Sequence, residues 1–324
     1  MAVATEAKSG RTRRLDTVGS AKLREALVGY AFIAIPMGFF VLFFIFPIVY
    51  AIYISFFDWG ILGKIQYLGL QNYRDLIHDQ AFWTWPPHIH AGSDNSAFWN
   101  TVYFTAVVVP TQMALGLMLA LIVNARIRGR TFFRAAYYFP SLTSSAAIVA
   151  VAIYILNPDG VFNAILSKIK GEEVRTLWFG QSSTALESIM GLNVWTTSGT
   201  IMLFYLATLQ SIPTDVYEAA AIDGASRWRI FWRITFPLLK PGHFFVAVLS
   251  VIGCLKIFDQ AFIVSSGKGG PAYSTETAVL YLYQTAIFDQ FWGYAAAIGV
   301  VMFLIIFAIT LAQRLLFGSS EIGY

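Results

Sequence analysis

Residues Glu218–Pro241 read EAAAIDGASRWRIFWRITFPLLKP and lie between two apolar runs, each of about the length that crosses a bilayer. Small side chains lead to an Asp-Gly pair, and a second part interleaves arginines with tryptophans and phenylalanines. A span that faces lipid does not tolerate this charge, and a simple connecting loop does not need this pattern. The segment is therefore expected at a membrane surface, either as an amphipathic connector or as a helix on which another protein docks.

The composition around this segment is that of a membrane protein. Of the 324 residues, 57% are hydrophobic and 12% are charged, and the mean hydropathy is +0.63. An ordinary soluble domain has about 45–50% apolar and about 25% charged residues. Recurrent apolar runs of membrane length predict an all-α integral membrane protein. The net charge of +4 is modest and gives no reason to expect a nucleic-acid partner.

Six transmembrane helices are predicted, and together they form one domain over residues 27–317. The expected spans are Leu27–Phe57, Ala97–Asn124, Phe132–Leu156, Ala185–Gln210, Gly242–Val264 and Phe291–Phe317. Residues 1–26 are expected to form an N-terminal segment and residues 318–324 a C-terminal tail. The first span is too long for the core of a signal peptide and lacks a small-residue cleavage site, so we expect it to be retained.

Lysines and arginines in the loops predict the orientation of these spans. If the N-terminus is cytoplasmic, the segments on that side hold 15 of the 22 basic residues, the opposite loops hold 6, and Lys256 lies inside a span. This distribution predicts that both termini are cytoplasmic. It also predicts that residues 58–96 form an extracytoplasmic loop and that residues 211–241 lie in the cytoplasm.

Residue types that bind metals or nucleotides are sparse. His88 and His90 lie close together in the loop 58–96, but no carboxylate or cysteine completes a site at a suitable spacing. Cys254 is the single cysteine, so neither a disulfide nor a cysteine-based metal motif is expected. The stretch SSGKGG at 265–270 lacks the first glycine and the final Ser/Thr of a phosphate-binding loop. We therefore expect this chain to hold no metal, no cofactor and no catalytic site.

The segment 211–241 divides into two helices of different character. Thr214 can cap the first helix, and Asp215 and Glu218 place negative charge near its start. The alanines that follow leave a flank almost free of side chains, which another protein can approach closely, and Gly224 lets the chain turn. In the second helix the aromatic residues share one face and the arginines lie beside it, as in helices at a membrane interface.

The whole segment closely resembles the EAA loop of permease subunits in bacterial ATP-binding-cassette importers. The family pattern is matched by Glu218, Ala219, Ala220, Asp223, Gly224, Ala225, Ile234 and Pro237. Five further stretches resemble the carbohydrate-type branch: YLGLQNYRDLI (67–77), FWNTVYFT (98–105), IRGRTFFRAAYYFP (127–140), NPDGVFNAIL (157–166) and GGPAYSTETAVLYLYQTAI (269–287). Two stretches depart from that branch: about fifteen residues near 84–98 look inserted, and SSGKGGP (265–271) carries a lysine that relatives more often lack.

This resemblance implies a permease of the type I importer fold, located in the bacterial inner membrane and without an ATPase site of its own. It implies that the coupling residues, which contact a separate ATPase subunit, are Glu218, Ala219, Ala220, Asp223, Gly224 and Ala225. The implied assembly contains a second, similar permease, two ATP-binding subunits that use ATP and Mg²⁺, and an extracytoplasmic solute-binding protein, all associated with membrane lipid.

Polar residues inside two predicted spans are candidates for the solute pathway. Lys256 and Asp259 lie at positions i and i+3 of the fifth span, where they either pair with one another or line a polar path. The fourth span contains NVWTTSGT (193–200), whose hydroxyls either bond to neighbouring helices or contact solute. Resemblance to maltose-type permeases implies a pathway lined by Trp195, Thr196, Thr197, Thr200, Ser250, Lys256 and Asp259.

The predicted function is transport of a sugar, an oligosaccharide or a related polyol, driven by a separate ATPase. A glycerol-phosphate-type importer shares these signatures, and Lys256 keeps this alternative open. An ion-coupled carrier would need coupling carboxylates within its spans, and only Asp259 qualifies. A membrane-embedded enzyme would need a catalytic constellation, which the sequence does not contain.

Overall fold

The computed structural model describes residues 25–84, 96–125 and 128–317, and it divides into two units, Met1–Ile54 and Ser55–Tyr324. In the first unit the described residues form one helix over Glu25–Ile54, whose 30 residues are sufficient to cross a bilayer. Its second half contains a π-helical stretch, η1 (Val41–Ile45), followed by α2 (Phe46–Ile54). The helix ends before Phe57, the predicted end of the span, because Phe57 already belongs to a β-hairpin.

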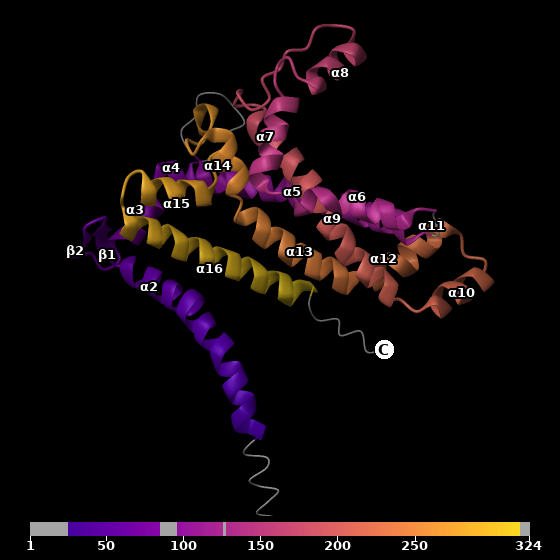
Figure 1. Cartoon of the computed structure of the whole chain (residues 1–324), viewed down its shortest axis with the longest axis horizontal. Helices are drawn as coiled ribbons and strands as arrows, with labels where there is room; N and C mark the ends of the chain where they lie inside the picture. The colour runs from indigo at the N-terminus through magenta and orange to yellow at the C-terminus, as the bar shows by residue number, and fades with distance from the viewer. Residues whose placement is uncertain (1–24, 85–95, 126–127, 318–324) are drawn as a thin grey trace, which may run out of the picture. The chain divides into compact units, whose positions relative to one another are not determined.

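The second unit is built on long apolar helices (Figure 1). Four of them are α5 (Ala97–Asn124), α9 (Ala185–Ser211), α13 (Lys240–Leu255) and α16 (Trp292–Phe317). A further span consists of α6 (Arg130–Leu142) and α7 (Ser145–Ile155), which are bent by 97° relative to one another. With the helix of the first unit, the described residues hold up to six spans, as predicted from the sequence.

Two of the predicted spans are not continuous helices. The span predicted over Phe132–Leu156 bends because Thr143 and Ser144 have extended backbones, with ψ angles of 142° and 136°. The span predicted over Gly242–Val264 breaks after Leu255 and resumes as α14 (Asp259–Ser265).

Two glycines allow α5, α6 and α9 to pack closely. A Cβ atom on Gly116 of α5 would lie 2.4 Å from Cγ2 of Ile201 in α9. A Cβ atom on Gly199 of α9 would lie 2.2 Å from the carbonyl oxygen of Tyr137 in α6. Both distances are far inside van der Waals contact, so any larger side chain would force the helices apart.

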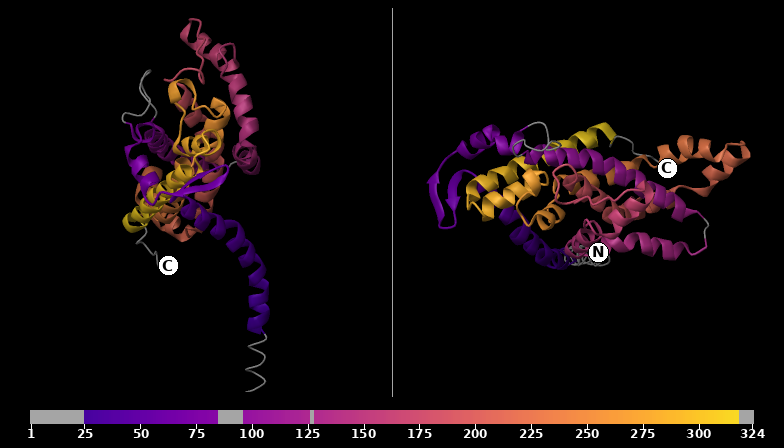
Figure 2. Two further views of the ribbon diagram at one scale, coloured as in Figure 1. Left: turned by 90° about the vertical axis from the view of Figure 1, so that its left-hand side faces the viewer. Right: turned by 90° about the horizontal axis from the view of Figure 1, so that it is seen from above.

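Short elements gather at one end of the helices of this unit, opposite to α10 (Thr214–Ile222), as Figures 1 and 2 show. They include α3 (Gln71–His78), α4 (Gln80–Trp83) and α15 (Ala278–Ile287). A further helix, α8 (Val161–Lys170), lies apart from them in the α7–α9 connection, beyond the end of α7 (Figure 1). Strands β1 (Phe57–Gly60) and β2 (Gly63–Tyr67) form an antiparallel hairpin. The hairpin lies at the start of the loop predicted over residues 58–96, and the helical spans agree with the all-α prediction.

Asp79 holds the short elements together. Its Oδ2 accepts hydrogen bonds from the hydroxyls of Tyr281 in α15 (2.7 Å) and Tyr294 in α16 (2.6 Å). Its Oδ1 accepts from the backbone N–H of Ala81 and so caps α4. One carboxylate at the start of α4 therefore joins this helix to α15 and α16, whose tyrosines lie more than 200 residues further along the sequence.

The connection between α14 and α15 is tightly folded, and its last part, residues 274–277, is buried. Ser266, Ala272 and Tyr273 have left-handed backbones with φ of 52°, 48° and 58°, which non-glycine residues adopt only when the surroundings fix them. The amide of Asn100 in α5 donates hydrogen bonds to the carbonyl oxygens of Tyr273 (3.2 Å) and Glu276 (3.0 Å). These bonds fix the connection to the N-terminal end of α5.

Candidate functional site

The predicted coupling helix is present as α10. Gly224 has a φ of +71° and ends the helix, with its N–H donating to the carbonyl of Ala221 at 3.1 Å. The N–H of Ala225 donates to the carbonyl of Ala220 at 3.0 Å. These two bonds form a Schellman motif, in which glycine is the residue that best accepts the left-handed backbone. The prediction that Gly224 lets the chain turn is therefore confirmed.

One face of α10 is attached to the bundle and the other is free to meet a partner. Tyr217 packs against the apolar cluster of α5 and α9, and its hydroxyl accepts a hydrogen bond from Thr235 Oγ1 at 3.4 Å. Ala220 is buried, whereas Ile222 is 87% exposed. Ile222 is not one of the predicted coupling residues; of those residues, Glu218, Ala219, Asp223 and Gly224 are exposed. The exposed face thus combines small side chains with a carboxylate and one projecting isoleucine.

Thr214 does not cap α10, contrary to the prediction. The N-cap position is Pro213, no side chain bonds to the first free N–H groups, and Thr214 Oγ1 lies 3.5 Å from Asp215 Oδ1. Because the helix begins at Thr214 itself, the hydroxyl is one residue too late to act as a cap. Asp215 does lie in the first turn, where its charge favours the helix dipole.

The aromatic half of the segment forms three short consecutive helices: α11 (Arg227–Ile230), η2 (Phe231–Thr235) and α12 (Phe236–Leu238). Ser226 caps the first of them, since its Oγ accepts from the N–H of Arg229 at 3.3 Å. The Trp232 ring lies 5.6 Å from that of Trp228 and 4.9 Å from that of Phe231. The predicted aromatic face is therefore present as a contiguous ring cluster.

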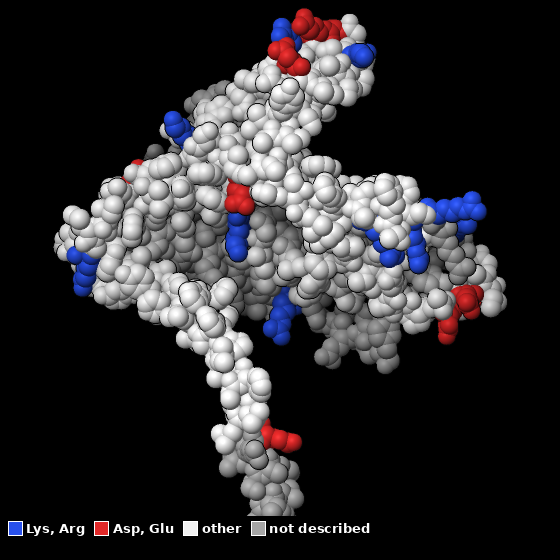
Figure 3. All heavy atoms as spheres, in the orientation of Figure 1, with Lys and Arg blue, Asp and Glu red and all other residues white. Residues whose placement is uncertain are grey.

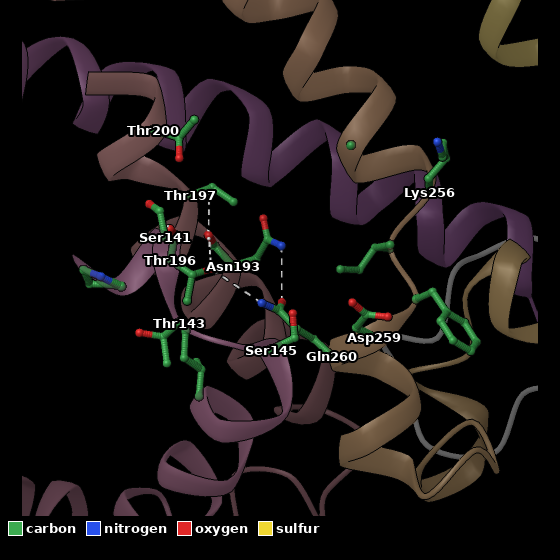
Figure 4. Close-up of a pocket in the computed structure, with 15 residues that line it drawn as sticks. Ser141, Thr143, Ser145, Asn193, Thr196, Thr197, Thr200, Lys256, Asp259 and Gln260 are labelled. Atoms are coloured by element: carbon green, nitrogen blue, oxygen red, sulfur yellow. Dashed lines mark hydrogen bonds between the residues drawn. The ribbon is translucent and has the colours of Figure 1, made fainter. Parts of the chain in front are cut away.

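A polar pocket of about 330 Å³ lies where two helix interruptions meet the continuous helix α9 (Figure 4). The bend between α6 and α7, the middle of α9 and the break between α13 and α14 all contribute to it. Its polar lining consists of Ser141, Thr143, Ser145, Asn193, Thr196, Thr197, Thr200, Lys256, Asp259 and Gln260. Hydroxyls and amides therefore dominate the lining, and both helix interruptions that the sequence analysis missed serve to form it.

A chain of hydrogen bonds organises this lining. The Thr197 hydroxyl lies 2.7 Å both from Gln112 Oε1 in α5 and from the carbonyl oxygen of Asn193. The Asn193 amide donates to Gln260 Oε1 (3.3 Å), and the Gln260 amide donates to Thr196 Oγ1 (3.5 Å). Gln112 and Gln260 are 2% and 5% exposed, so the chain runs through the protein interior. It holds α5, α9 and α14 in fixed relation around the pocket.

Lys256 and Asp259 both line the pocket but do not pair. Among the described residues neither side chain takes part in a salt bridge, and in Figure 4 the Lys256 ammonium points away from the Asp259 carboxylate. The mutual ion pair considered in the sequence analysis is therefore wrong. Its premise was a continuous helix, whereas Lys256 is the C-cap of α13 and Asp259 is the first residue of α14.

The predicted pathway residues divide between two adjoining pockets. Ser250 lines a second pocket of about 410 Å³, which shares Asn193, Thr197 and Thr200 with the first and is otherwise lined mostly by apolar side chains. Trp195 lines neither pocket and is 53% exposed. The remaining predicted residues, Thr196, Lys256 and Asp259, line the first pocket.

The sequence analysis did not select several residues that form the site. Ser141, Thr143 and Ser145 come from the α6–α7 bend, and Gln112 comes from the middle of α5. The signal for Gln112 was available, because an amide in the middle of an apolar span requires a polar partner. The serines and threonine gave no such signal, because their role depends on the bend.

No metal site accompanies these pockets in the described part of the chain, where no three His, Cys, Asp or Glu side chains form a group that could hold an ion. His88 and His90 lie outside the described residues.

Comparison with known proteins places these features in a family. Residues 112–318 match the family described as the inner membrane component of binding-protein-dependent transport systems. The chain belongs to this family. The permease is 30% identical over 302 residues to the probable ABC transporter permease protein YurN of Bacillus subtilis, covering 92% of the chain and 98% of the relative. It is 30% identical to the multiple sugar-binding transport system permease protein MsmF of Streptococcus mutans, covering 91% of the chain and 96% of the relative.

The permease also shares its fold with a solved transporter. A chain in the crystal structure of a bacterial alginate ABC transporter, in complex with an alginate pentasaccharide-bound periplasmic protein, matches with a TM-score of 0.77. The match covers 91% of the permease and 95% of that chain, at 21% identity. This likeness confirms the predicted importer-permease fold. The family match confirms an inner-membrane location and a chain whose ATPase is a separate subunit.

Proposed function

We propose that this permease carries a carbohydrate, a sugar or oligosaccharide, through the polar pocket between α6–α7, α9 and the α13–α14 break. The observation that carries this proposal is that hydroxyls and amides line a pocket of about 330 Å³. A sugar presents many hydroxyls, and each needs a donor or acceptor when it leaves water. The pocket volume lies at the lower end of the range for small-molecule sites. The relative MsmF, named as a sugar transport permease, agrees with this substrate class.

A glycerol phosphate is not favoured as the substrate. A phosphate is usually bound by several basic groups or by a bidentate arginine. This pocket contains one lysine and one carboxylate, and no arginine lines it. The opposite charges of Lys256 and Asp259 suit a neutral solute better than a dianion.

The proposed driving force is ATP hydrolysis in a separate subunit that docks on α10. The exposed small residues of α10 allow a cleft to close around the helix, and Glu218 offers an ion-pair partner to a basic residue in that cleft. This arrangement requires α10 to lie in the cytoplasm, in agreement with the distribution of basic residues. The proposed assembly adds a second permease, two ATP-binding subunits and a solute-binding protein at the opposite membrane face. ATP and Mg²⁺ are bound by the ATPase subunits, and this chain binds no cofactor.

Reconstituted transport tests the proposal. The permease is purified with its partner subunits and placed in proteoliposomes, and uptake of a panel of sugars and of glycerol phosphate is measured with the cognate binding protein and ATP. We expect vanadate-sensitive uptake of a sugar and no uptake of glycerol phosphate. Glu218→Lys should abolish uptake while the protein still inserts in the membrane. Uptake that follows an ion gradient without ATP, or normal uptake by the Glu218→Lys protein, would overturn the assignment.

A further inference from the structure

The aromatic cluster of α11–α12 forms one wall of an apolar groove that the transport function does not use. The groove has a volume of about 470 Å³. Its lining is wholly apolar: Ala114, Leu117, Met118 and Leu121 from α5 form one wall, and Trp228, Phe231, Trp232 and Phe236 form the other. Trp228 is 72% exposed, so the groove opens to the surface of this chain.

Positive charge accompanies this groove. Arg229 and Arg233 each directly follow a groove-lining tryptophan, and a residue one step along a helix is turned by only about 100°. These arginines therefore lie on the helix face next to the aromatic wall, and both are exposed. No aspartate or glutamate occurs from residue 224 to residue 258. In Figure 3 the body of the molecule is largely uncharged, and the end that carries α10 and α11 shows lysine and arginine side chains with acidic side chains beside them.

The arginines at the groove are also free of internal ion pairs. Within the described residues, the salt bridges that the structure contains involve Arg175 with Asp159 and Glu173, at the α8 connection. Neither Arg229 nor Arg233 forms a salt bridge with a described residue. An occupant of the groove therefore meets an apolar lining, with two exposed arginines on the adjacent helix face.

We propose that this groove binds an anionic phospholipid of the membrane leaflet that faces α10, with an acyl chain along the aromatic wall and the phosphate at Arg229 and Arg233. The apolar lining removes the acyl chain from water, and this burial of apolar surface stabilises the bound lipid. Arginine is suited to the phosphate because its guanidinium donates in a planar fork. A helix of a partner subunit would match the apolar wall but would leave the arginines without a counter-charge. The choice of leaflet rests on the proposed orientation of the permease, whereas the lipid's charge follows from Arg229 and Arg233 and does not depend on that orientation.

Native mass spectrometry of the intact purified importer tests this site. The complex is equilibrated with equimolar phosphatidylglycerol and phosphatidylcholine, and the retained lipids are counted. We expect retention of phosphatidylglycerol, and about 30-fold weaker retention in the R229Q/R233Q double variant. A basic residue near an anionic lipid surface contributes about 1 kcal/mol, and 1.4 kcal/mol corresponds to tenfold. The matched control is R314Q, which removes an exposed arginine from α16 and should leave lipid retention unchanged.

A second variant distinguishes the contribution of the acyl chain from that of the phosphate charge. Ala114→Phe places a ring in the groove and should reduce retention of both lipids, while R229Q/R233Q should reduce phosphatidylglycerol alone. Equal retention of both lipids by the unmodified complex would overturn the proposal, as would unchanged phosphatidylglycerol in both variants. Crosslinking of Met118→Cys to a partner subunit would instead show that protein covers the groove. Sugar uptake is measured on the same preparations, so failure of the lipid site is distinguishable from failure of the transport assignment.

Discussion

The Thr197 hydroxyl lies 2.7 Å from Gln112 Oε1, and this contact joins the middle of α9 to the middle of α5. The two residues are 85 positions apart in the sequence. Gln112 is 2% exposed and also donates to the sulfur of Cys254 in α13 at 3.8 Å. A single buried amide thus connects the three helices that surround the second pocket, and it does so beside the candidate solute path.

Thr197→Val should destabilise the permease, because valine keeps the shape of threonine but leaves Gln112 Oε1 without its donor. An unsatisfied buried polar group costs about 1–3 kcal/mol, which corresponds to a fall of several degrees in the thermal midpoint. The midpoint is measured in detergent by the change in tryptophan fluorescence. Thr197→Ser retains the hydroxyl and should lose less stability. Equal midpoints for the two variants would contradict the role given to this bond.

Gly199→Ala and Gly191→Ala should have opposite effects, although both glycines lie in α9. A Cβ atom at position 199 would lie 2.2 Å from the Tyr137 carbonyl, so α6 would have to move away and the folded yield should fall sharply. A Cβ atom at position 191 would meet no atom within 4 Å. There alanine should stabilise the helix by up to about 1 kcal/mol. Yield and thermal midpoint of the two proteins are compared side by side; a fall in both would refute the packing argument.

The transmembrane helices and α10 could be predicted from sequence because their signals are local. Apolar length predicts the spans within a few residues of their observed bounds, and Ala97–Asn124 is reproduced without change. The turn at Gly224 could be predicted because a glycine just after the end of a helix is itself the signal for such a turn. In each of these cases the residues that decide the structure lie within one or two turns of one another.

The pocket itself could be predicted only in part, because distant residues form it. Asn193 and Gln260 meet across 67 positions, and the break after Leu255 that brings them together has no strong local signal. Of the two alternatives that a continuous helix left open for Lys256 and Asp259, mutual pairing and lining of a polar path, the break removes the first. Asp79 is a similar case, since the sequence gives no indication that Tyr281 and Tyr294 both donate to it.

Gly224→Val should uncouple the permease from its ATPase without preventing membrane insertion. A β-branched residue is strained at a φ of +71°, at a cost of about 1–3 kcal/mol, and the Schellman motif that ends α10 should open. We expect co-purification of the ATPase subunit to fall severalfold. Gly224→Asn is the matched control, because asparagine accepts the left-handed backbone better than other side chains. If valine and asparagine retain the ATPase equally well, the turn at Gly224 does not position the docking surface.

Asp259→Asn should reduce sugar uptake more than Lys256→Gln. Both residues line the pocket, but in Figure 4 the Lys256 ammonium points away from the Asp259 carboxylate. A sugar hydroxyl that donates to the carboxylate therefore does not need the lysine as a second partner. A hydrogen bond to a charged group contributes about 1.5–3 kcal/mol, so loss of the carboxylate should lower the uptake rate at least about tenfold. The rate is measured in proteoliposomes with saturating binding protein. A larger effect of Lys256→Gln would favour an anionic solute and would count against a neutral sugar.

Glu276 should make the stability of the permease depend on pH. It lies between α14 and α15 and is fully buried, and neither carboxyl oxygen has a hydrogen-bond partner among the described residues. Burial raises the pKa of Glu276 to about 8, and the negative charge of Asp79 adds to the rise; the nearby amide of Gln284 lowers the pKa but bonds to the Gly267 carbonyl. The folded protein therefore holds a proton on Glu276 that the unfolded chain releases above its ordinary pKa of 4.5.

Because the folded pKa is raised, the stability that Glu276 contributes is full below about pH 4.5 and is lost as the pH rises through about 8. Thermal midpoints of the detergent-solubilised permease, measured from pH 5 to pH 9, should fall with increasing pH. Glu276→Gln fixes the neutral form and should flatten this part of the profile. Glu172→Gln, which changes an exposed carboxyl in the α8–α9 connection, should leave the profile as it is in the unmodified protein. A slope that persists in Glu276→Gln would assign the dependence to another group.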